Sequence, residues 1–245
     1  METTTYIALS NQGALRREMD SIANNMANMN TTGFKRERMM FVDQLTRSRS
    51  GDFIADQRLS FVRDIASYRD ISEGPIEQTG NTLDIAIHGD GYFTIQTPGG
   101  ERYTRSGNFR LDNGGQLVTQ DGYSVLSDAG APIFFAREDT TITIAGDGSI
   151  ATENGQLGKL KIVTFDNEQD MLGVGSGLYS TNQAPIDKPD AQVAQYALEK
   201  SNIEAITEMT RMMDVNRRYA STQKMIDSED ERIRKMVRDL PLLNG

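Results

Sequence analysis

The chain of 245 residues has no cysteine, no tryptophan and a single histidine, His88. Without cysteine it can form no disulfide, no thiolate nucleophile and no Cys-ligated metal site. One histidine excludes His-pair zinc motifs and leaves little imidazole for acid–base catalysis. No apolar run approaches the roughly 18 residues of a membrane-spanning helix, and the first six residues lack the basic and apolar regions of a secretory signal peptide. We therefore expect neither direct membrane insertion nor a Sec-type leader.

The net charge of -9 makes nucleic acid an improbable partner, because phosphates attract basic surfaces. The charge is unevenly distributed: residues 1–75 and 191–245 are each neutral, and the whole excess of acid lies in residues 76–190. Of 22 glycines, 17 fall in that middle segment, whereas 11 of the 12 methionines lie outside it. These boundaries predict an N-terminal helix with an extended linker, a central β domain, and a long C-terminal helix that packs with the first helix.

Apolar residues near the N-terminus recur at spacings of four and three: Leu15, Met19, Ile22, Met26 and Met29. This pattern predicts a helix that packs on another helix through a narrow stripe. The run 30–33 predicts the end of the helix, with Gly33 at the position after the C-cap and Phe34 following it. We expect residues 35–45, which have mixed charge, to be irregular or partly helical.

The C-terminal region predicts about ten turns of helix. Ser201 and Glu204 have the spacing of a capping box, no Gly or Pro interrupts residues 202–240, and Pro241 follows as a stop. The apolar stripe of this helix is Met212, Val215, Tyr219, Thr222, Ile226, Ile233, Val237 and Leu240, widened at its start by Ile206, Met209 and Met213.

Two long apolar stripes exceed what a small β core can cover. They could pack on each other as a helical hairpin within a monomer, or they could be buried against neighbouring subunits of an assembly. Asn24, Asn25 and Asn28 crowd one short helical stretch, although asparagine is a middling helix former. Fraying of the helix end and hydrogen bonding to neighbouring subunits both remain open as explanations.

The middle of the chain predicts short antiparallel strands separated by glycine-rich turns, including a hairpin turn at 97–100. No helical crossover interrupts the strands, so a parallel sheet is not expected. The predicted fold class is α+β, with the terminal helices forming a coiled-coil-like core domain and a central antiparallel all-β domain. The expected strands are 83–88, 92–96, 102–104, 109–111, 117–119, 123–126, 133–135, 140–144 and 160–165.

Several motifs resemble sites but lack the required partners. The Gly-Asp-Gly turns at 89–91 and 146–148 lack the ligand spacing of a calcium loop, and His88 has no second metal ligand of its kind. The segment 173–177 lacks the glycine order of a nucleotide fingerprint, and we expect a flexible loop there. We therefore predict no catalytic residue, no cofactor and no metal. A small enzyme, the least favoured alternative, would need a carboxylate pair in a cleft.

Three ordered blocks carry a family resemblance. Residues 24–35, Asn-Asn-Met-Ala-Asn-Met-Asn-Thr-Thr-Gly-Phe-Lys, resemble the N-terminal signature of the bacterial flagellar rod and hook proteins. Residues 201–240 resemble their C-terminal signature, and the runs 84–93, 103–109 and 117–122 resemble their shared β domain. The resemblance implies a non-enzymatic structural subunit that polymerises helically in the rod, the drive shaft carrying torque from motor to hook.

Within the family, residues 6–10, 14–20 and 215–220 resemble the proximal-rod branch. The alternatives are the distal-rod branch and an axial fibre subunit of another kind, such as a phage-tail or adhesin fibre. The resemblance implies hetero-assembly of several copies with other axial proteins, the proximal and distal rod subunits among them. It also implies secretion through the flagellar type III export apparatus and a location in the basal-body rod within the periplasmic space.

Residues expected at subunit interfaces come from the two stripes and the two terminal signatures. They are Leu15, Met19, Ile22, Asn24, Asn25, Met26, Asn28, Gly33, Phe34, Ile203, Ile206, Met209, Met213, Val215, Tyr219, Ile226, Ile233 and Val237.

Overall fold

The computed structural model describes residues 2–47, 58–139 and 141–239. The fold is α+β: helix α1 (Glu2–Ala27) comes first in the sequence, helix α2 (Ala205–Asp239) comes last, and a region rich in antiparallel strands lies between them in the sequence. The chain divides into two compact units. We call the first, made of Met1–Ala27, Glu37–Arg69 and Glu204–Gly245, the helical unit. The second, made of Asn28–Arg36 and Asp70–Ile203, is the β unit.

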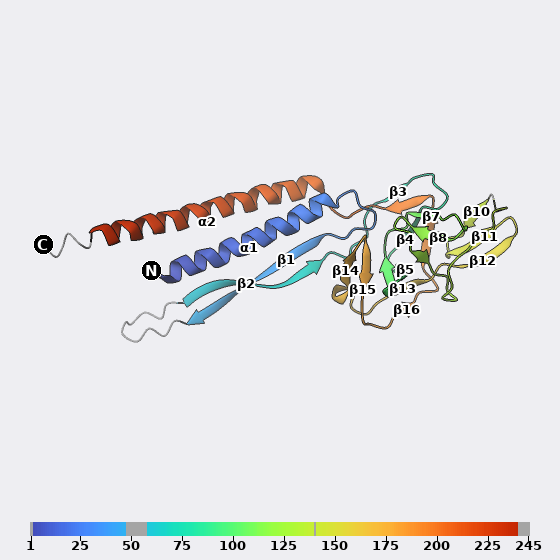
Figure 1. Cartoon of the computed structure of the whole chain (residues 1–245), viewed down its shortest axis with the longest axis horizontal. Helices are drawn as coiled ribbons and strands as arrows, with labels where there is room; N and C mark the ends of the chain where they lie inside the picture. Colours follow the sequence, from blue (N-terminus) through green and yellow to red (C-terminus); the bar gives the residue numbers. More distant parts are fainter. Residues whose placement is uncertain (1, 48–57, 140, 240–245) are drawn as a thin grey trace. The chain divides into compact units, whose positions relative to one another are not determined.

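In the helical unit, α1 and α2 lie side by side and run in opposite directions (Figure 1). Leu15, Ile22 and Val215 are buried between them. Partly buried side chains flank this core: Met19, Met26, Met212 and Tyr219. The spacing of four and three therefore predicted these packed residues correctly, because residues at such intervals share one side of a helix. The predicted widening of the α2 stripe by Ile206, Met209 and Met213 was wrong, because these side chains are exposed and lie about half a turn away from Val215.

The helical unit also contains a hairpin of β1 (Glu37–Arg47) and β2 (Arg58–Arg69), which pair antiparallel from Glu37 opposite Arg69. Both strands lie alongside α1. The prediction of irregular or partly helical structure for residues 35–45 was wrong. Strand β1 takes its hydrogen bonds from a partner beyond residue 57, and the local sequence of a strand does not show its partner.

Both predicted helix-end motifs were wrong. Helix α1 ends at Ala27, six residues before Gly33, so Gly33 is no helix cap. Its φ of 67° instead lets the chain approach β18 (Ala197–Glu199), where the Gly33 N–H donates to the Glu199 carbonyl at 2.8 Å. Helix α2 begins at Ala205, and the Ser201 hydroxyl accepts the N–H of Ile203 at 3.3 Å, outside the helix. The uninterrupted helix up to Asp239 is confirmed, whereas Leu240 and Pro241 lie outside the described residues.

The β unit contains a nine-stranded sheet with the path β14-β15-β6-β5-β9-β8-β7, in which β13 joins β5 to β16. Smaller sheets are β10-β11-β12, β17-β4 and β18-β3, and every strand pair is antiparallel, as predicted. The remaining strands are β3 (Ile76–Gln78), β4 (Ile85–His88), β5 (Tyr92–Thr97), β6 (Gly100–Thr104), β7 (Phe109–Leu111), β8 (Leu117–Thr119), β9 (Ser124–Val125), β10 (Ile142–Ile144), β11 (Ser149–Thr152), β12 (Gly155–Lys159), β13 (Ile162–Thr164), β14 (Leu172–Gly175), β15 (Leu178–Ser180), β16 (Ile186–Asp187) and β17 (Gln192–Gln195).

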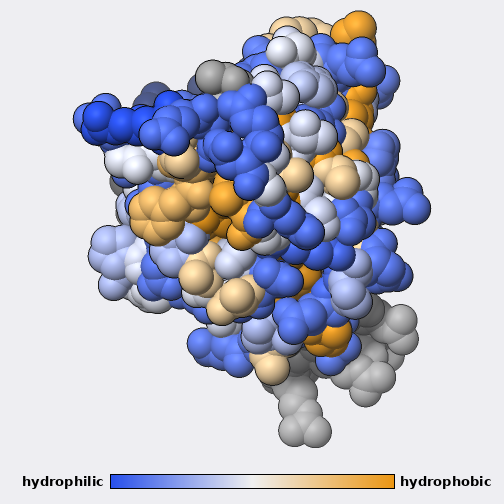
Figure 2. Space-filling view, turned by 90° about the vertical axis from the view of Figure 1, so that its right-hand side faces the viewer, coloured by the Kyte–Doolittle hydropathy of each residue, from blue (hydrophilic) through white to orange (hydrophobic). Residues whose placement is uncertain are grey.

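Two apolar clusters hold the β unit together. The larger contains the fully buried Ile85, Phe93 and Ile95, and the rings of Phe93 and Phe109 meet edge to face at 5.1 Å. The smaller is aromatic and includes Tyr92, Tyr103, Phe165 and Tyr179. On the face of the molecule in Figure 2, hydrophilic side chains predominate and apolar side chains gather in one larger patch.

Eight of the nine predicted strand segments overlap observed strands. The exception is 133–135, where Phe134 forms only an isolated bridge to Gln116. The flexible loop predicted at 173–177 was also wrong, because β14 extends to Gly175 and pairs with β15. The tight turn between them has positive φ at Gly175, Ser176 and Gly177, which explains its glycine content.

Candidate functional site

One part of the predicted interface set is buried within the chain itself. Leu15, Ile22 and Val215 are at most 5% exposed in the seam between α1 and α2. Met19, Met26 and Tyr219 are half-buried beside them. The pairing of α1 with α2 therefore buries much of the surface of these six side chains within the chain itself.

Another part of the set forms a second apolar surface on α2. Ile206, Met209 and Met213 are 79%, 47% and 54% exposed. At 3.6 residues per turn, they fall on the side of α2 opposite the buried Glu208 and Val215. We call these three residues the outer stripe. An apolar stripe on each side of one helix provides two packing faces, and α1 occupies only one of them.

The seam of α2 also continues beyond its pairing with α1. Helix α2 has 35 residues against 26 in α1, a difference of about 13 Å at 1.5 Å per residue. Ile226 is half-buried, whereas Ile233 and Val237, further along the same face, are 41% and 63% exposed. We call Ile233 and Val237 the distal seam, because they continue the spacing of the packed face but remain exposed.

Asn25 joins α1 to the first strand. Its side chain is 1% exposed, its Nδ2 donates to the Glu37 carbonyl at 2.8 Å, and its Oδ1 accepts the Glu37 N–H at 3.0 Å. Its Nδ2 also lies 3.5 Å from the Glu208 carboxylate. Asn24 is exposed and Asn28 is half-buried. The Asn25 amide is therefore engaged inside the helical unit and is not frayed.

A chain of charges supports this contact. Glu208 is fully buried, with Arg211 at 3.8 Å one turn along α2. Arg211 in turn lies 3.5 Å from Glu18 on α1. The Arg211–Glu18 pair joins α2 to α1 and favours one register of the two helices.

The β unit contains a buried ion triad of Lys35, Glu199 and Arg105, which are 2%, 1% and 4% exposed. The Lys35 ammonium lies 2.6 Å from Glu199 Oε1, and the Arg105 guanidinium donates to Oε2 from Nε at 2.8 Å and from Nη2 at 2.7 Å. We call these three residues the charged junction. Buried charges of this kind are tolerated only when they are paired and hydrogen-bonded.

Backbone carbonyls accept further hydrogen bonds from the two cations of the charged junction. Lys35 donates to the Ser72 carbonyl at 2.7 Å, and Arg105 Nη1 donates to the Gly89 and Gly91 carbonyls at 2.8 and 2.7 Å. Burial lowers the pKa of the Lys35 ammonium, and the neighbouring Glu199 carboxylate opposes this effect.

Glycine allows the backbones to meet at the junction. A Cβ on Gly33 would lie 2.7 Å from the Arg105 carbonyl carbon, and one on Gly74 would lie 2.0 Å from the Lys200 carbonyl oxygen. The Gly74 N–H donates to Glu199 Oε1 at 2.9 Å. The predicted interface residue Gly33 therefore has a role inside the β unit, where Phe34 and Ile203 are half-buried.

A second layer of bonds lies beside the charged junction. The Arg36 N–H donates to Asn202 Oδ1 at 2.8 Å, and Asn202 Nδ2 donates to the Asp70 carbonyl at 2.8 Å. The Arg36 guanidinium lies 2.7 Å from the Asp70 carboxylate. Hydrogen bonds from Ser72 and Arg36 lower the pKa of Asp70 to about 2. Segments 28–36, 70–74 and 199–203 are thus bonded to one another.

Sequence reasoning missed the charged junction. One available signal was Glu199, a carboxylate that directly follows the apolar pair Ala197-Leu198. Another was Lys35-Arg36 at the end of the N-terminal signature. Neither signal indicated Arg105 as the third member, because the three residues are far apart in the sequence and only the folded sheet brings them together.

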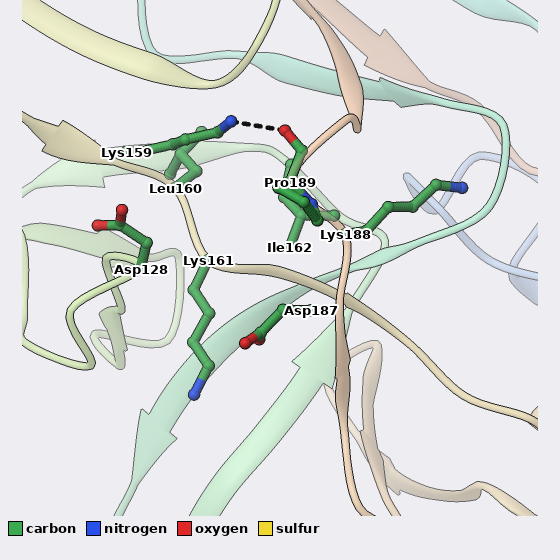
Figure 3. Close-up of a pocket in the computed structure, with 8 residues that line it drawn as sticks. All are labelled: Asp128, Lys159, Leu160, Lys161, Ile162, Asp187, Lys188 and Pro189. Atoms are coloured by element: carbon green, nitrogen blue, oxygen red, sulfur yellow. Dashed lines mark hydrogen bonds between the residues drawn. The ribbon is translucent and has the colours of Figure 1, made fainter.

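A cavity of about 340 Å³ in the β unit is lined by three lysines and two aspartates (Figure 3). Its ammonium groups point in different directions: Lys159 donates to the Pro189 carbonyl at 2.7 Å, Lys188 donates to the Asp90 carbonyl at 3.0 Å, and Lys161 is 3.5 Å from Glu101. The three ammonium groups therefore do not form a joint binding site for one anion.

Among the described residues, no group of three or more His, Asp or Glu side chains is arranged to hold a metal ion. His88 is exposed, and its Nδ1 lies 3.5 Å from Glu73. Among the same residues, neither helix has the length and apolar character needed to cross a membrane.

Comparison with known proteins agrees with the terminal and central signatures. Residues 6–35 match the model "Flagella basal body rod protein", residues 86–152 match "Flagellar hook protein FlgE/F/G D1 domain", and residues 194–239 match "Flagellar basal body rod FlgEFG protein C-terminal".

Similar whole proteins include a flagellar basal-body rod protein FlgF of Caulobacter vibrioides, 38% identical over the full length of both chains. A flagellar basal-body rod protein FlgG of Bacillus subtilis is 34% identical, over 97% of this chain and 98% of its own. A FlgF of Mesorhizobium japonicum is 32% identical, over 96% of this chain and 98% of its own.

Proposed function

This chain belongs to the family of flagellar basal-body rod proteins, and we propose that it polymerises helically as a subunit of the proximal rod. In that place it forms part of the shaft that transmits torque from motor to hook. The observation that carries the proposal is the outer stripe, three apolar side chains of α2 that the chain's own helix pair leaves exposed.

The helix pair has the properties expected of an assembling element. The seam uses one face of α2 within the chain, and the outer stripe and the distal seam offer further apolar surface to helices of neighbouring subunits. A contact between two different faces of like subunits generates a helix when its repetition does not close into a ring. We propose that the terminal helices form a coiled-coil-like core in this way.

The β unit is proposed as the outer, solvated part of each subunit. The excess of acid responsible for the net charge of -9 lies in residues 76–190, and like charges on neighbouring copies disfavour their close contact. Neutral helical ends do not oppose assembly in this way. We further propose that other axial proteins are the partners, that the rod segment crosses the periplasmic space, and that the chain reaches it through the type III export apparatus.

The assignment to the proximal rod rests on sequence similarity. A FlgF aligns over the whole chain at 38% identity, and a FlgG aligns over nearly the whole chain at 34%. The distal rod is therefore the second candidate. A catalytic role is not proposed, because the family is structural and the cavity of Figure 3 has no convergent acid–base pair.

The test is a charge placed on the outer stripe. Ile206→Asp with Met213→Asp should leave the isolated chain folded, since both side chains are about half exposed or more, and should abolish swimming. Ser221→Asp with Ser228→Asp adds the same charge at exposed polar positions of α2 and should leave swimming intact. Circular dichroism checks folding, and electron microscopy of basal bodies checks the rods. Normal swimming of the outer-stripe variant would contradict the proposal.

A further inference from the structure

Methionine supplies the oxidisable sulfur of this chain. The sequence has 12 methionines but no cysteine and no tryptophan, so an oxidant of the peroxide class reacts mainly with methionine thioethers. Among the described residues, the most exposed methionines are 43% to 54% accessible: Met40, Met209, Met213, Met225 and Met236. A peroxide in solution therefore reaches these side chains directly.

Two of the exposed methionines belong to the outer stripe. Met209 and Met213 make up this stripe together with Ile206, and they are 47% and 54% exposed. Met225 is 48% exposed on the same helix, but at about 3.6 residues per turn it lies about a third of a turn away from the stripe. Met209 and Met213 thus combine access to an oxidant with a place in an apolar packing face.

The oxidation converts a thioether to a sulfoxide. The sulfur lone pair attacks one oxygen of hydrogen peroxide, an S–O bond forms as the O–O bond breaks, and the second oxygen leaves as water. Sulfur loses two electrons and the peroxide gains them. Methionine sulfoxide reductases reverse the change, so the modification is not permanent.

A sulfoxide on the outer stripe opposes close packing against another helix. Its oxygen is a hydrogen-bond acceptor, and burying it without a donor costs free energy. A facing helix offers no free donor from its interior backbone, since those N–H groups are bonded within the helix. On the chain's own side, the hydroxyl of Thr210, next to Met209 in the sequence, already donates to the Ile206 carbonyl at 2.9 Å.

We propose that Met209 and Met213 form a modification site at which peroxide oxidation withdraws the unassembled chain from rod assembly and reduction restores it. The site acts before assembly, because a neighbouring helix packed on the outer stripe covers both sulfur atoms. The inference rests on the proposed function, since it treats the outer stripe as a contact between subunits.

The first measurement is chemical and uses the purified full-length chain. Hydrogen peroxide is added, and peptide mass spectrometry follows sulfoxide at each methionine. We expect Met209, Met213 and Met225 to react at similar rates and Met171, which is 1% exposed, to react at least about tenfold more slowly. Resistance of Met209 and Met213 equal to that of Met171 would overturn the proposal.

The second measurement follows assembly in cells. Production of the chain is switched on in hydrogen peroxide, at the dose that converts about half of Met225 in chains recovered outside basal bodies. If Met209 and Met213 are converted to the same extent, about a quarter of the chains keep both thioethers. We therefore expect new swimming cells to appear about fourfold more slowly than in untreated cells of the same strain.

Two double variants, each compared with its own untreated cells at this dose, identify the methionines responsible. Met209→Leu with Met213→Leu removes both sulfur atoms from the outer stripe but keeps it apolar, and it should lose most of the peroxide effect. Met225→Leu with Met236→Leu removes two similarly exposed methionines of α2 outside the stripe and should be slowed about fourfold, like the native chain. Equal slowing of the first variant and the native chain would overturn the proposal.

The inference and the proposed function fail separately. Normal swimming of the variant Ile206→Asp with Met213→Asp contradicts the proposed function. Loss of swimming in that variant, together with equal peroxide effects in the native chain and in Met209→Leu with Met213→Leu, contradicts the inference alone.

Discussion

Glu199 offers the sharpest test of the packing in the β unit. Its carboxylate receives four donors: Lys35 Nζ and the Gly74 N–H on Oε1, and two nitrogens of Arg105 on Oε2. Glu199→Gln keeps the shape of the side chain but removes its charge. Whichever way the new amide turns, its NH₂ faces donors, so one pair of hydrogen bonds is replaced by donor–donor repulsion.

The expected loss is large because the site is buried. Glu199→Gln leaves the cations of Lys35 and Arg105 without a counter-charge at 4% exposure or less. Removing one partner from a buried ion pair costs about 3–5 kcal/mol, a large fraction of the roughly 5–15 kcal/mol that stabilises a typical domain. The triple variant Lys35→Met, Glu199→Leu and Arg105→Met should recover part of the lost stability, since none of the three buried charges then remains.

Urea unfolding followed by the near-ultraviolet signal of the tyrosines measures the free energy of unfolding of the β unit. The control is Glu77→Gln, which breaks the more exposed ion pair with Lys200 at 3.3 Å within the β unit and should cost below about 1 kcal/mol. If Glu199→Gln proved no more destabilising than this control, the charged junction would not have the stabilising role assigned to it.

Three further predictions concern single side chains. Asn25→Ala should destabilise the helical unit by about 1–3 kcal/mol, because it leaves the Glu37 backbone groups unpaired, whereas the exposed Asn24→Ala should cost under about 1 kcal/mol; thermal melts followed at the helical signal distinguish the two. Gly33→Ala should lower the melting temperature of the β unit much more than Gly80→Ala does. Both glycines have positive φ, but only at Gly33 would the added Cβ collide with neighbouring backbone, that of Arg105; equal melting temperatures of the two variants would refute the collision. The pKa of Asp70 is about 2 when folded against an ordinary 3.8, so the folded state binds fewer protons between these values and stability present above pH 4 falls as the pH approaches 2. Asp70→Asn should remove at most about 2 kcal/mol of that acid dependence, seen as a smaller difference between urea midpoints at pH 7 and pH 2.5.

The sequence predicted well whatever depends on local periodicity. The packed faces of α1 and α2 followed from residues such as Leu15, Ile22 and Val215, because a helix repeats within its own segment. Strands such as β4 and β5 followed from alternation and from the glycine turns between them. In each case the pattern of apolar residues or glycines lies within about ten residues of the helix or strand that it predicts.

The features that were missed depend on residues brought together from a distance. Strand β1 is defined by its pairing with β2, and Gly33 by its approach to Arg105. The predicted interface role of Asn25 overlooked the backbone of Glu37 as a partner. The charged junction combines three residues between 35 and 199, and no spacing rule connects them.

The most direct measurement is a high-resolution density map of intact basal bodies from cells that produce this chain. We predict that the chain is found in the rod, with Ile206, Met209 and Met213 packed against helices of neighbouring subunits. A map in which the rod lacks this chain, or in which these three side chains face solvent, would contradict the account.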